Sequence, residues 1–292
     1  MTNAKPKLAL AIGIICISVF PILVKLQLTG GLISAFYRMA IAGALLLPYV
    51  IVTKKFKLPR ASILILAVLC GLLFASDVAV WNISIQESSA TQASLLTNLS
   101  PVWVGIASFL FLKNKPATNF WIGTVIAVFG MITLVGFEFF LNLDFNAAFL
   151  LAILSGVLYA IYMLVSKNVL SEMDVLSFMM VTLITSTLFV CLALNEPFSG
   201  FSNAGWLVLF IQGIVCQLIA WLLISYATQN MRATRVSLSL LGQAVLATIL
   251  AWLFLDEKIT FQMIVGGLIL LLGIRITFYS KTISLRNIVN KD

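Results

Sequence analysis

Histidine is absent from the 292-residue sequence, and only 10% of its residues are charged. A chain without histidine lacks the side chain that most often serves as a general base or a metal ligand. The sequence also contains no Gly-Lys-Ser loop that would cradle phosphates, and no two carboxylates share an apolar run. We therefore expect no catalytic residue, no metal site and no cofactor. Nothing favours an intramembrane protease or a lipid transferase.

Cysteine is scarce as well. The four cysteines lie singly inside apolar runs, and none belongs to a Cys-x-x-Cys motif: Cys16, Cys70, Cys191 and Cys216. Isolated cysteines of this kind usually behave as small buried hydrophobic residues. We interpret all four as buried thiols.

Apolar residues, in contrast, make up 62% of the chain, and its mean hydropathy is +1.12. A soluble domain is closer to half apolar and a quarter charged. Apolar runs of about 20 residues recur, and each is long enough to cross a bilayer as a helix. The sequence predicts an all-α polytopic membrane protein with ten transmembrane helices, at residues 7–27, 32–52, 61–84, 88–111, 117–136, 147–167, 174–194, 203–225, 230–254 and 261–280.

The basic residues fall on one side of these ten spans. If the N-terminus is cytoplasmic, the outer half of the chain holds only Lys25, Arg38 and Lys258, and the other fifteen of the 18 basic residues are inside. This asymmetry is typical of cytoplasmic loops. We expect an integral protein of a bacterial inner membrane with both termini cytoplasmic. Because the +8 net charge lies in short loops, it does not indicate a nucleic-acid partner.

One stretch of the sequence occurs twice. Residues Ala90–Gly130 align without a gap on Ala233–Gly273, 143 residues later, and about a third of the positions are identical. The shared residues include an Ala-Thr pair, a Leu-Phe-Leu run and two glycines in each copy. This period is too long for a solenoid repeat. The sequence therefore predicts two homologous halves, residues 1–139 and 140–292.

Five spans per half is an odd number, so the two halves must cross the membrane in opposite directions. Their loops agree: Lys113–Lys115 follows the fourth span, whereas Asp256–Lys258 follows the ninth and has gained acidic residues. We predict two inverted five-helix repeats related by a pseudo-two-fold axis in the membrane plane. Such repeats support alternating access, with a substrate site near the midplane between them.

The motif within the duplicated stretch resembles the EamA-like domain of the drug/metabolite transporter superfamily. The stretch Ala233–Ile274 contains the motifs Ala-Thr-x-x-Ser-Leu, Leu-Phe-Leu-Asp-Glu-Lys, Gly-Gly and Leu-Gly-Ile, and Ala90–Met131 contains a weaker copy. Arg38, in the sequence Phe-Tyr-Arg-Met-Ala, also resembles the family. The resemblance implies two tandem EamA-type repeats that transport a small molecule. It leaves open amino acids, amines, nucleotide-sugars, S-adenosylmethionine, choline-like cations and drugs. The chain departs from the family at Lys113–Lys115 and in carrying Asp77.

Asp77 is the foremost candidate for the substrate site. It lies inside the third predicted span, where a carboxylate is costly and should face protein or a wet cavity. It could bind a substrate ammonium or carry a proton. Alternatively, it could form a structural ion pair or gate with Arg38 on the second span.

Further polar and aromatic residues are candidates to line the same cavity. Beside Asp77, Trp81 offers an aromatic ring for a cation and Asn82 lies to the side. The fourth and ninth spans would contribute polar faces, with Ser94 and Asn98 on the fourth and Ser239 and Gln243 on the ninth. The sixth and eighth spans would contribute a wall of aromatic and amide side chains, with Tyr159 and Tyr162 on the sixth and Gln217 and Trp221 on the eighth. Pro21 and Pro101 are predicted hinges. Each residue could instead serve helix association or interface anchoring.

The function best supported is a secondary transporter, an exporter of amino acids or related amine-bearing metabolites. The alternatives are an uptake or exchange carrier for another metabolite, broad drug efflux, or a membrane sensor that binds ligand without moving it. No ATP-binding motif is present, so a substrate or ion gradient must drive transport. The expected partners are the substrate, membrane lipid and, where coupling occurs, protons. We expect a monomer or a weak homodimer.

Overall fold

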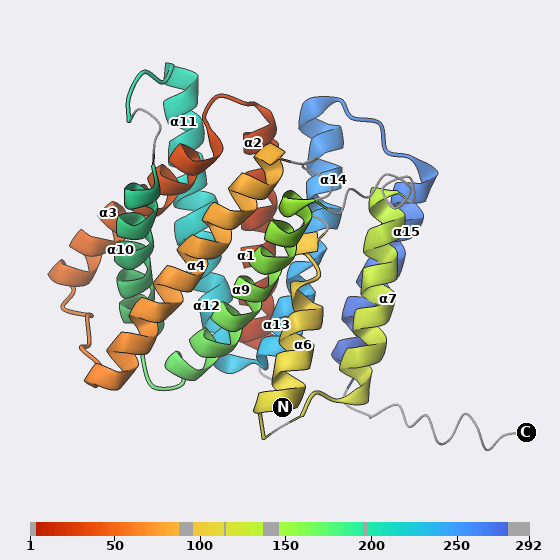
Figure 1. The fold of residues 1–292 in the computed structure, drawn as a ribbon, viewed down its shortest axis with the longest axis horizontal. Helices are drawn as coiled ribbons and strands as arrows, with labels where there is room; N and C mark the ends of the chain where they lie inside the picture. Colours follow the sequence, from red (N-terminus) through yellow and green to blue (C-terminus); the bar gives the residue numbers. More distant parts are fainter. Residues whose placement is uncertain (1–3, 88–95, 114, 137–145, 195–197, 280–292) are drawn as a thin grey trace, which may run out of the picture.

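The computed structural model describes residues 4–87, 96–113, 115–136, 146–194 and 198–279 (Figure 1). Within these ranges the chain is helical and contains no strand. Eight helical segments are long and apolar enough to cross a membrane, and Ser100–Phe111 and Phe261–Thr277 are shorter apolar helices. These ten segments correspond to the ten predicted spans, which confirms the all-α membrane architecture.

The helices follow one another along the chain with short connections. In order they are α1 (Ala4–Ser18), α2 (Phe20–Lys25), α3 (Gly31–Val52), α4 (Ala61–Glu87), α6 (Ser100–Phe111), α7 (Thr118–Val135), α9 (Ala147–Val169), α10 (Val175–Ala193), α11 (Asn203–Ile211), η1 (Gln212–Ile219), α12 (Ala220–Asn230), α13 (Ala233–Leu240), α14 (Gly242–Leu255) and α15 (Phe261–Thr277).

Local sequence signals explain many of the helix starts. Four helices of the second half begin at a side chain that accepts a hydrogen bond from the backbone N–H three residues on, at 3.0–3.2 Å: Asn146, Asp174, Ser202 and Thr260. These residue types are preferred at helix N-caps because they satisfy a donor that the helix leaves free.

Two predicted hinge prolines lie at interruptions of a span. The first span is divided at Val19 into α1 and α2, and Pro21 lies in the first turn of α2. In the fourth span a turn at residues 98 and 99 precedes α6, and Pro101 lies in its first turn. Proline lacks a backbone N–H, so it fits the first turn of a helix, whereas further along it removes a hydrogen bond of the helix.

The eighth span is longer than predicted. It runs through α11, η1 and α12 to Asn230 rather than ending at residue 225, and α13 begins at Ala233. The reason is that Gln229 lies on the helix and donates hydrogen bonds to the carbonyls of Leu170 and Met173, at 2.8 and 3.2 Å. Its polar side chain therefore joins two helices and does not mark a loop.

The bundle exposes apolar side chains and buries polar ones. Phe111, Leu192 and Phe261 are each more than 80% exposed, whereas Asp77 and Gln217 are less than 10% exposed. A soluble protein would show the opposite distribution. Lipid around the bundle would cover the exposed residues, because hydrocarbon is as apolar as they are.

The contact between α7 and α15 relates the two halves by inversion. A Cβ added to Gly123 would meet the Gly273 carbonyl oxygen at 2.6 Å, and one added to Gly130 would meet the Gly266 carbonyl oxygen at 2.8 Å. The helices are therefore antiparallel and approach backbone to backbone. Because Gly123 corresponds to Gly266 and Gly130 to Gly273, exchanging the halves exchanges the two contacts. This symmetry confirms the predicted inverted repeat.

The largest of the other helix contacts obey the same exchange. The pair α4–α9 has its counterpart in α1–α12, the pair α4–α10 in α3–η1, and the pair α6–α9 in α1–α14. The pairs α3–α10 and α7–α15 are their own counterparts. In Figure 1, α7 and α15 form one edge of the bundle, and the other helices surround its centre. The two repeats therefore meet along the middle of the bundle.

The chain enters and leaves the bundle at the same end. The Lys7 ammonium lies 5.5 Å from the centre of the Phe278 ring, so the start of α1 is close to the end of α15. Figure 1 shows the start of α1 at the end of the bundle opposite α2 and α11. This arrangement requires an even number of crossings, as the ten spans provide.

Candidate functional site

Asp77 lies on α4, where that helix packs against α9. Its carboxylate accepts a hydrogen bond from Ser155 Oγ at 2.5 Å, and only 7% of the residue is exposed. Ser155 and Tyr159 are one turn apart on α9, so the Tyr159 ring lies on the same helix face as the Asp77 partner. The carboxylate is thus held between two helices and away from lipid.

Arg38 does not pair with Asp77 in this structure, so the alternative of a structural ion pair between them is not observed. The Arg38 guanidinium lies 4.5 Å from the centre of the Phe20 ring, and its Nε is buried with no hydrogen-bond partner in the described ranges. In those same ranges the only ion pair joins Lys25 and Glu257. Arg38 and Asp77 lie on neighbouring spans, but α3 turns Arg38 toward α2.

Four aromatic rings from three spans gather beside Asp77. Trp221 of α12 lies edge-on to Phe74 of α4, with ring centres 4.8 Å apart, and to Tyr162 of α9 at 5.9 Å. Tyr159 lies 5.9 Å from Tyr162 and 6.4 Å from Trp221. Phe74 and Asp77 are three residues apart on α4 and share a face. The aromatic cluster and the carboxylate therefore border the same interior region.

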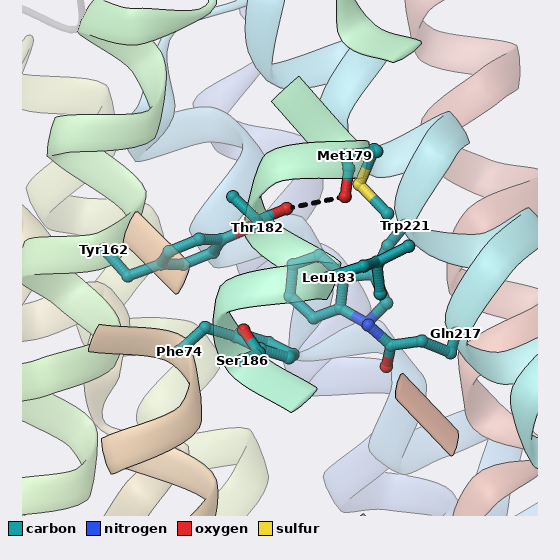
Figure 2. Close-up of a pocket in the computed structure, with 8 residues that line it drawn as sticks. All are labelled: Phe74, Tyr162, Met179, Thr182, Leu183, Ser186, Gln217 and Trp221. Atoms are coloured by element: carbon teal, nitrogen blue, oxygen red, sulfur yellow. Dashed lines mark hydrogen bonds between the residues drawn. The ribbon is translucent and has the colours of Figure 1, made fainter. Parts of the chain in front are cut away.

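The aromatic cluster adjoins a small hollow between α4, α9, α10 and α12 (Figure 2). The hollow is narrow, and its centre has room for about one water molecule. Its wall contains residues of both repeats: Phe74, Tyr162, Met179, Thr182, Leu183, Ser186, Gln217 and Trp221. A substrate larger than water would require the helices to move apart.

Two polar groups in this wall have no hydrogen-bond partner in the described part of the chain. Gln217 Oε1 and Trp221 Nε1 are both buried and unpaired, and the two residues are one turn apart on the eighth span. Figure 2 shows both side chains at the hollow. An unpaired buried acceptor and an unpaired buried donor each carry a desolvation cost, which a bound ligand could remove.

Several predicted site residues use their polar groups elsewhere. Asn82 donates to the Val78 carbonyl at 2.8 Å, and Ser239 donates to the Arg235 carbonyl at 2.8 Å, each within its own helix. Three others are half-buried and lie outside the wall of the hollow: Trp81, Asn98 and Gln243. Ser94 lies outside the described residues. The structure thus brings together Asp77, Tyr159, Tyr162, Gln217 and Trp221.

The sequence reasoning missed the residues of α10 that line the hollow, and it also missed two hydrogen-bonding side chains, Ser155 and Gln212. Thr182 and Ser186 of α10 line the hollow; Thr182 donates to the Met179 carbonyl at 3.1 Å, and Ser186 to the Gly71 carbonyl at 2.8 Å. Ser155 could have been found from its position one turn before Tyr159. Gln212 carried the same signal as Gln217, an amide within an apolar run.

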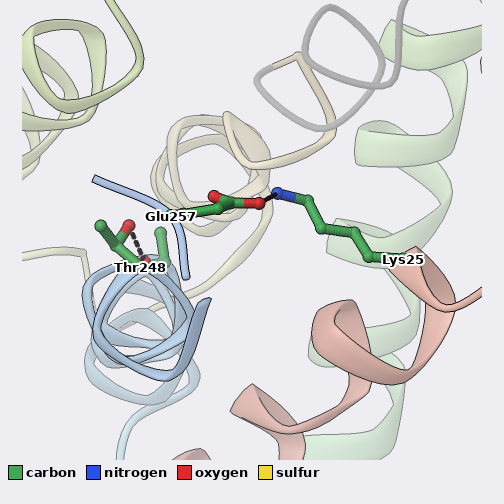
Figure 3. A network of polar contacts seen from close by, with 4 residues as sticks. Lys25, Thr248 and Glu257 are labelled. Atoms are coloured by element: carbon green, nitrogen blue, oxygen red, sulfur yellow. Dashed lines mark hydrogen bonds and ion pairs between the residues drawn. The ribbon is translucent and has the colours of Figure 1, made fainter. Parts of the chain in front are cut away.

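The ion pair between Lys25 and Glu257 joins the two repeats at one end of the bundle (Figure 3). Lys25 ends α2, and Glu257 belongs to the loop between α14 and α15. About half of each side chain is exposed, so this pair contributes little to stability. It nevertheless connects helices that must separate if this end opens.

Comparison with known proteins agrees with this architecture. The model of the EamA-like transporter family matches the chain twice, at residues 5–136 and 146–279. The uncharacterized transporter YdfC of Bacillus subtilis is 26% identical over 84% of this chain and 80% of its own length. An uncharacterized transporter of Archaeoglobus fulgidus is also 26% identical, over 83% of this chain and 86% of its own.

A solved crystal structure of a protein has the same fold. It superposes with a TM-score of 0.79 and covers 95% of this chain and 97% of its own, with 15% sequence identity. Two family matches that together span most of the chain, each covering one five-helix repeat, identify the duplication predicted from the sequence. The chain belongs to the EamA-like transporter family.

Proposed function

We propose that the protein is a secondary transporter that exports small amine-bearing metabolites, amino acids foremost, by alternating access. The observation that carries this proposal is the buried Asp77 carboxylate beside an aromatic-lined hollow between the two repeats. A carboxylate attracts an ammonium group, and aromatic faces favour both cations and apolar side chains. Gln217 and Trp221 add one acceptor and one donor for the ligand.

Asp77 also offers a means of coupling to a proton gradient. A carboxylate that binds an ammonium in one state and a proton in the other exchanges the two across the membrane. Such an exchange would drive export when protons flow inward. The same chemistry would support uptake or exchange if the gradients were reversed, so the direction rests on the physiological gradient.

The positive-inside distribution of basic residues favours an orientation with both termini in the cytoplasm of a bacterial cell. In this orientation the Lys25–Glu257 pair lies on the outer face. We assign the boundary between the repeats to residues 139 and 140, and the hinges to Pro21 and Pro101, where the first and fourth spans are interrupted.

The proposed function is tested by binding and flux together. Purified protein is screened against amino acids, amines and other metabolites for a rise in thermal unfolding temperature, and each hit is tested for counterflow in proteoliposomes. We expect at least one amine-bearing hit to be transported. Binding without counterflow would indicate a sensor, and hits limited to nucleotide-sugars or uncharged drugs would contradict the proposed substrate class.

The Lys25–Glu257 pair supplies a prediction about gating. Glu257→Gln removes the charge and keeps the shape, so the face that bears the pair should open more often. Because an exposed pair contributes about 0.2–1 kcal/mol, we expect a rise of about 1.4- to 5-fold in the rate at which a thiol reagent labels a cysteine placed in the hollow. Thr248→Val, which loses only a bond within α14, is the control. An unchanged rate in Glu257→Gln would exclude a gating role.

A further inference from the structure

A second group of buried polar side chains lies where α3 packs against η1. Ser34 Oγ donates a hydrogen bond to Gln212 Oε1 at 2.5 Å, and Arg38 follows Ser34 by one turn on α3. Ser34, Arg38 and Gln212 are 4%, 5% and 0% exposed, so none of them faces lipid. The hydrogen bond fixes the Gln212 amide with its oxygen toward α3.

This arrangement leaves two donors unused. Arg38 Nε and Gln212 Nε2 are both buried and have no hydrogen-bond partner in the described ranges. The Phe20 ring, 4.5 Å from the Arg38 guanidinium, offsets part of its charge but accepts no conventional N–H bond. Two unmet donors, one of them cationic, call for an acceptor with negative charge. A carboxylate is the simplest group with two oxygens for two such donors.

The Arg38 and Asp77 charges lie on two neighbouring helices, α3 and α4, and each points to a different partner. No ion pair forms between these two groups, because Asp77 bonds to Ser155 and Arg38 lies over Phe20. Opposite charges held apart in an apolar interior cannot neutralise each other. A ligand that carries both a positive and a negative group can neutralise both at once.

We propose that Arg38 and Gln212 form a subsite for the carboxylate of the substrate. The inference rests on the proposed function, in which Asp77 binds the ammonium group of the same molecule. The substrate is then a zwitterion of the amino-acid type, and the amine that lacks the carboxylate is a poorer ligand.

Three matched ligands test the subsite: phenylalanine, phenethylamine, which lacks the carboxylate, and 3-phenylpropanoate, which lacks the amine. Their affinities for the full chain in lipid nanodiscs are measured by calorimetric titration. Phenylalanine should bind the unaltered protein about 10- to 100-fold more tightly than phenethylamine, as expected for a charge-assisted hydrogen bond. In Arg38→Gln the ratio should fall toward one, because the phenylalanine affinity drops and the phenethylamine affinity does not. Arg38→Lys should restore part of the ratio.

The variants are first compared by thermal unfolding without ligand. If Arg38→Gln does not fold, Gln212→Met carries the test, because it keeps the side-chain length and removes the donor. The proposal is overturned if the unaltered protein binds phenylalanine and phenethylamine equally, or if the variants weaken both ligands by the same factor. Arg38-dependent binding of 3-phenylpropanoate without binding of phenethylamine would support the subsite and contradict only the ammonium role of Asp77. Failure of phenylalanine to bind the unaltered protein would overturn the subsite as proposed, whereas the proposed function is tested separately by the metabolite screen.

Discussion

Asp77→Asn is expected to reduce the affinity for an amine-bearing substrate by about 10- to 100-fold, because a hydrogen bond to a charged group contributes about 1.5–3 kcal/mol. Asparagine has the volume of aspartate and can still accept the Ser155 hydrogen bond, so the bundle should remain folded. The lost property is the negative charge. Equilibrium binding and counterflow in proteoliposomes measure the effect.

The pH dependence of substrate affinity distinguishes the loss of the Asp77 charge from a change in the shape of the site. A protonated carboxyl no longer attracts an ammonium, so the substrate affinity of the unaltered protein should fall as the pH is lowered through the Asp77 titration. Asp77→Asn should show a weak affinity that does not change with pH in that range. Ser155→Ala serves as a control, since it keeps the charge and should retain the pH dependence. An Asp77→Asn profile identical to that of the unaltered protein would make Asp77 a structural residue.

Gly266→Ala is expected to destabilise the bundle strongly, whereas Gly267→Ala should have little effect. A Cβ on Gly266 would lie 2.6 Å from the Leu134 Cα, so the backbones of α7 and α15 would have to separate. A Cβ on Gly267 would meet the Val245 side chain at 3.4 Å, an ordinary contact. Overpacking costs about 1–3 kcal/mol, and a contact with backbone should fall at the upper end.

Thermal unfolding of the purified variants measures this difference. Gly130→Ala should behave like Gly266→Ala, because a Cβ on Gly130 would lie 2.7 Å from the Leu270 Cα in the same helix contact. Equal unfolding temperatures for Gly266→Ala and Gly267→Ala would contradict the close approach of the two helices.

The spans and the duplication could be predicted from the sequence because each depends on one-dimensional information. Apolar run length and charge asymmetry define the spans, and a fixed offset of 143 residues relates the copies. The end of the eighth span could not be predicted in this way, because Gln229 resembles a loop residue until its hydrogen bonds to the Leu170 and Met173 carbonyls are known. A polar residue inside a bundle can join helices as readily as it can end one.

The candidate site was only partly predictable, since depth along a span does not fix the direction of a side chain. Asp77 and Arg38 lie on neighbouring spans, but Asp77 points to Ser155 of α9 and Arg38 to Phe20 of α2. Asn82 and Ser239 donate hydrogen bonds to carbonyls of their own helices, which the spacing of residues in the sequence alone does not reveal. Tyr162 and Trp221 do meet, because both rings contact Phe74 of α4.

The most direct test of alternating access uses one reporter cysteine in the hollow. Thr182→Cys, the reporter, is made in a protein in which the four native cysteines are replaced. Lys25→Cys and Glu257→Cys are added, and a bifunctional thiol reagent joins these two cysteines while substrate protects the reporter thiol. Labelling of the reporter by an impermeant reagent is then measured from each face of proteoliposomes. The predicted result is that the cross-link abolishes labelling from the face that bears it and preserves labelling from the opposite face. Continued labelling through the cross-linked face, or labelling from neither face before cross-linking, would contradict a site that opens to one side at a time.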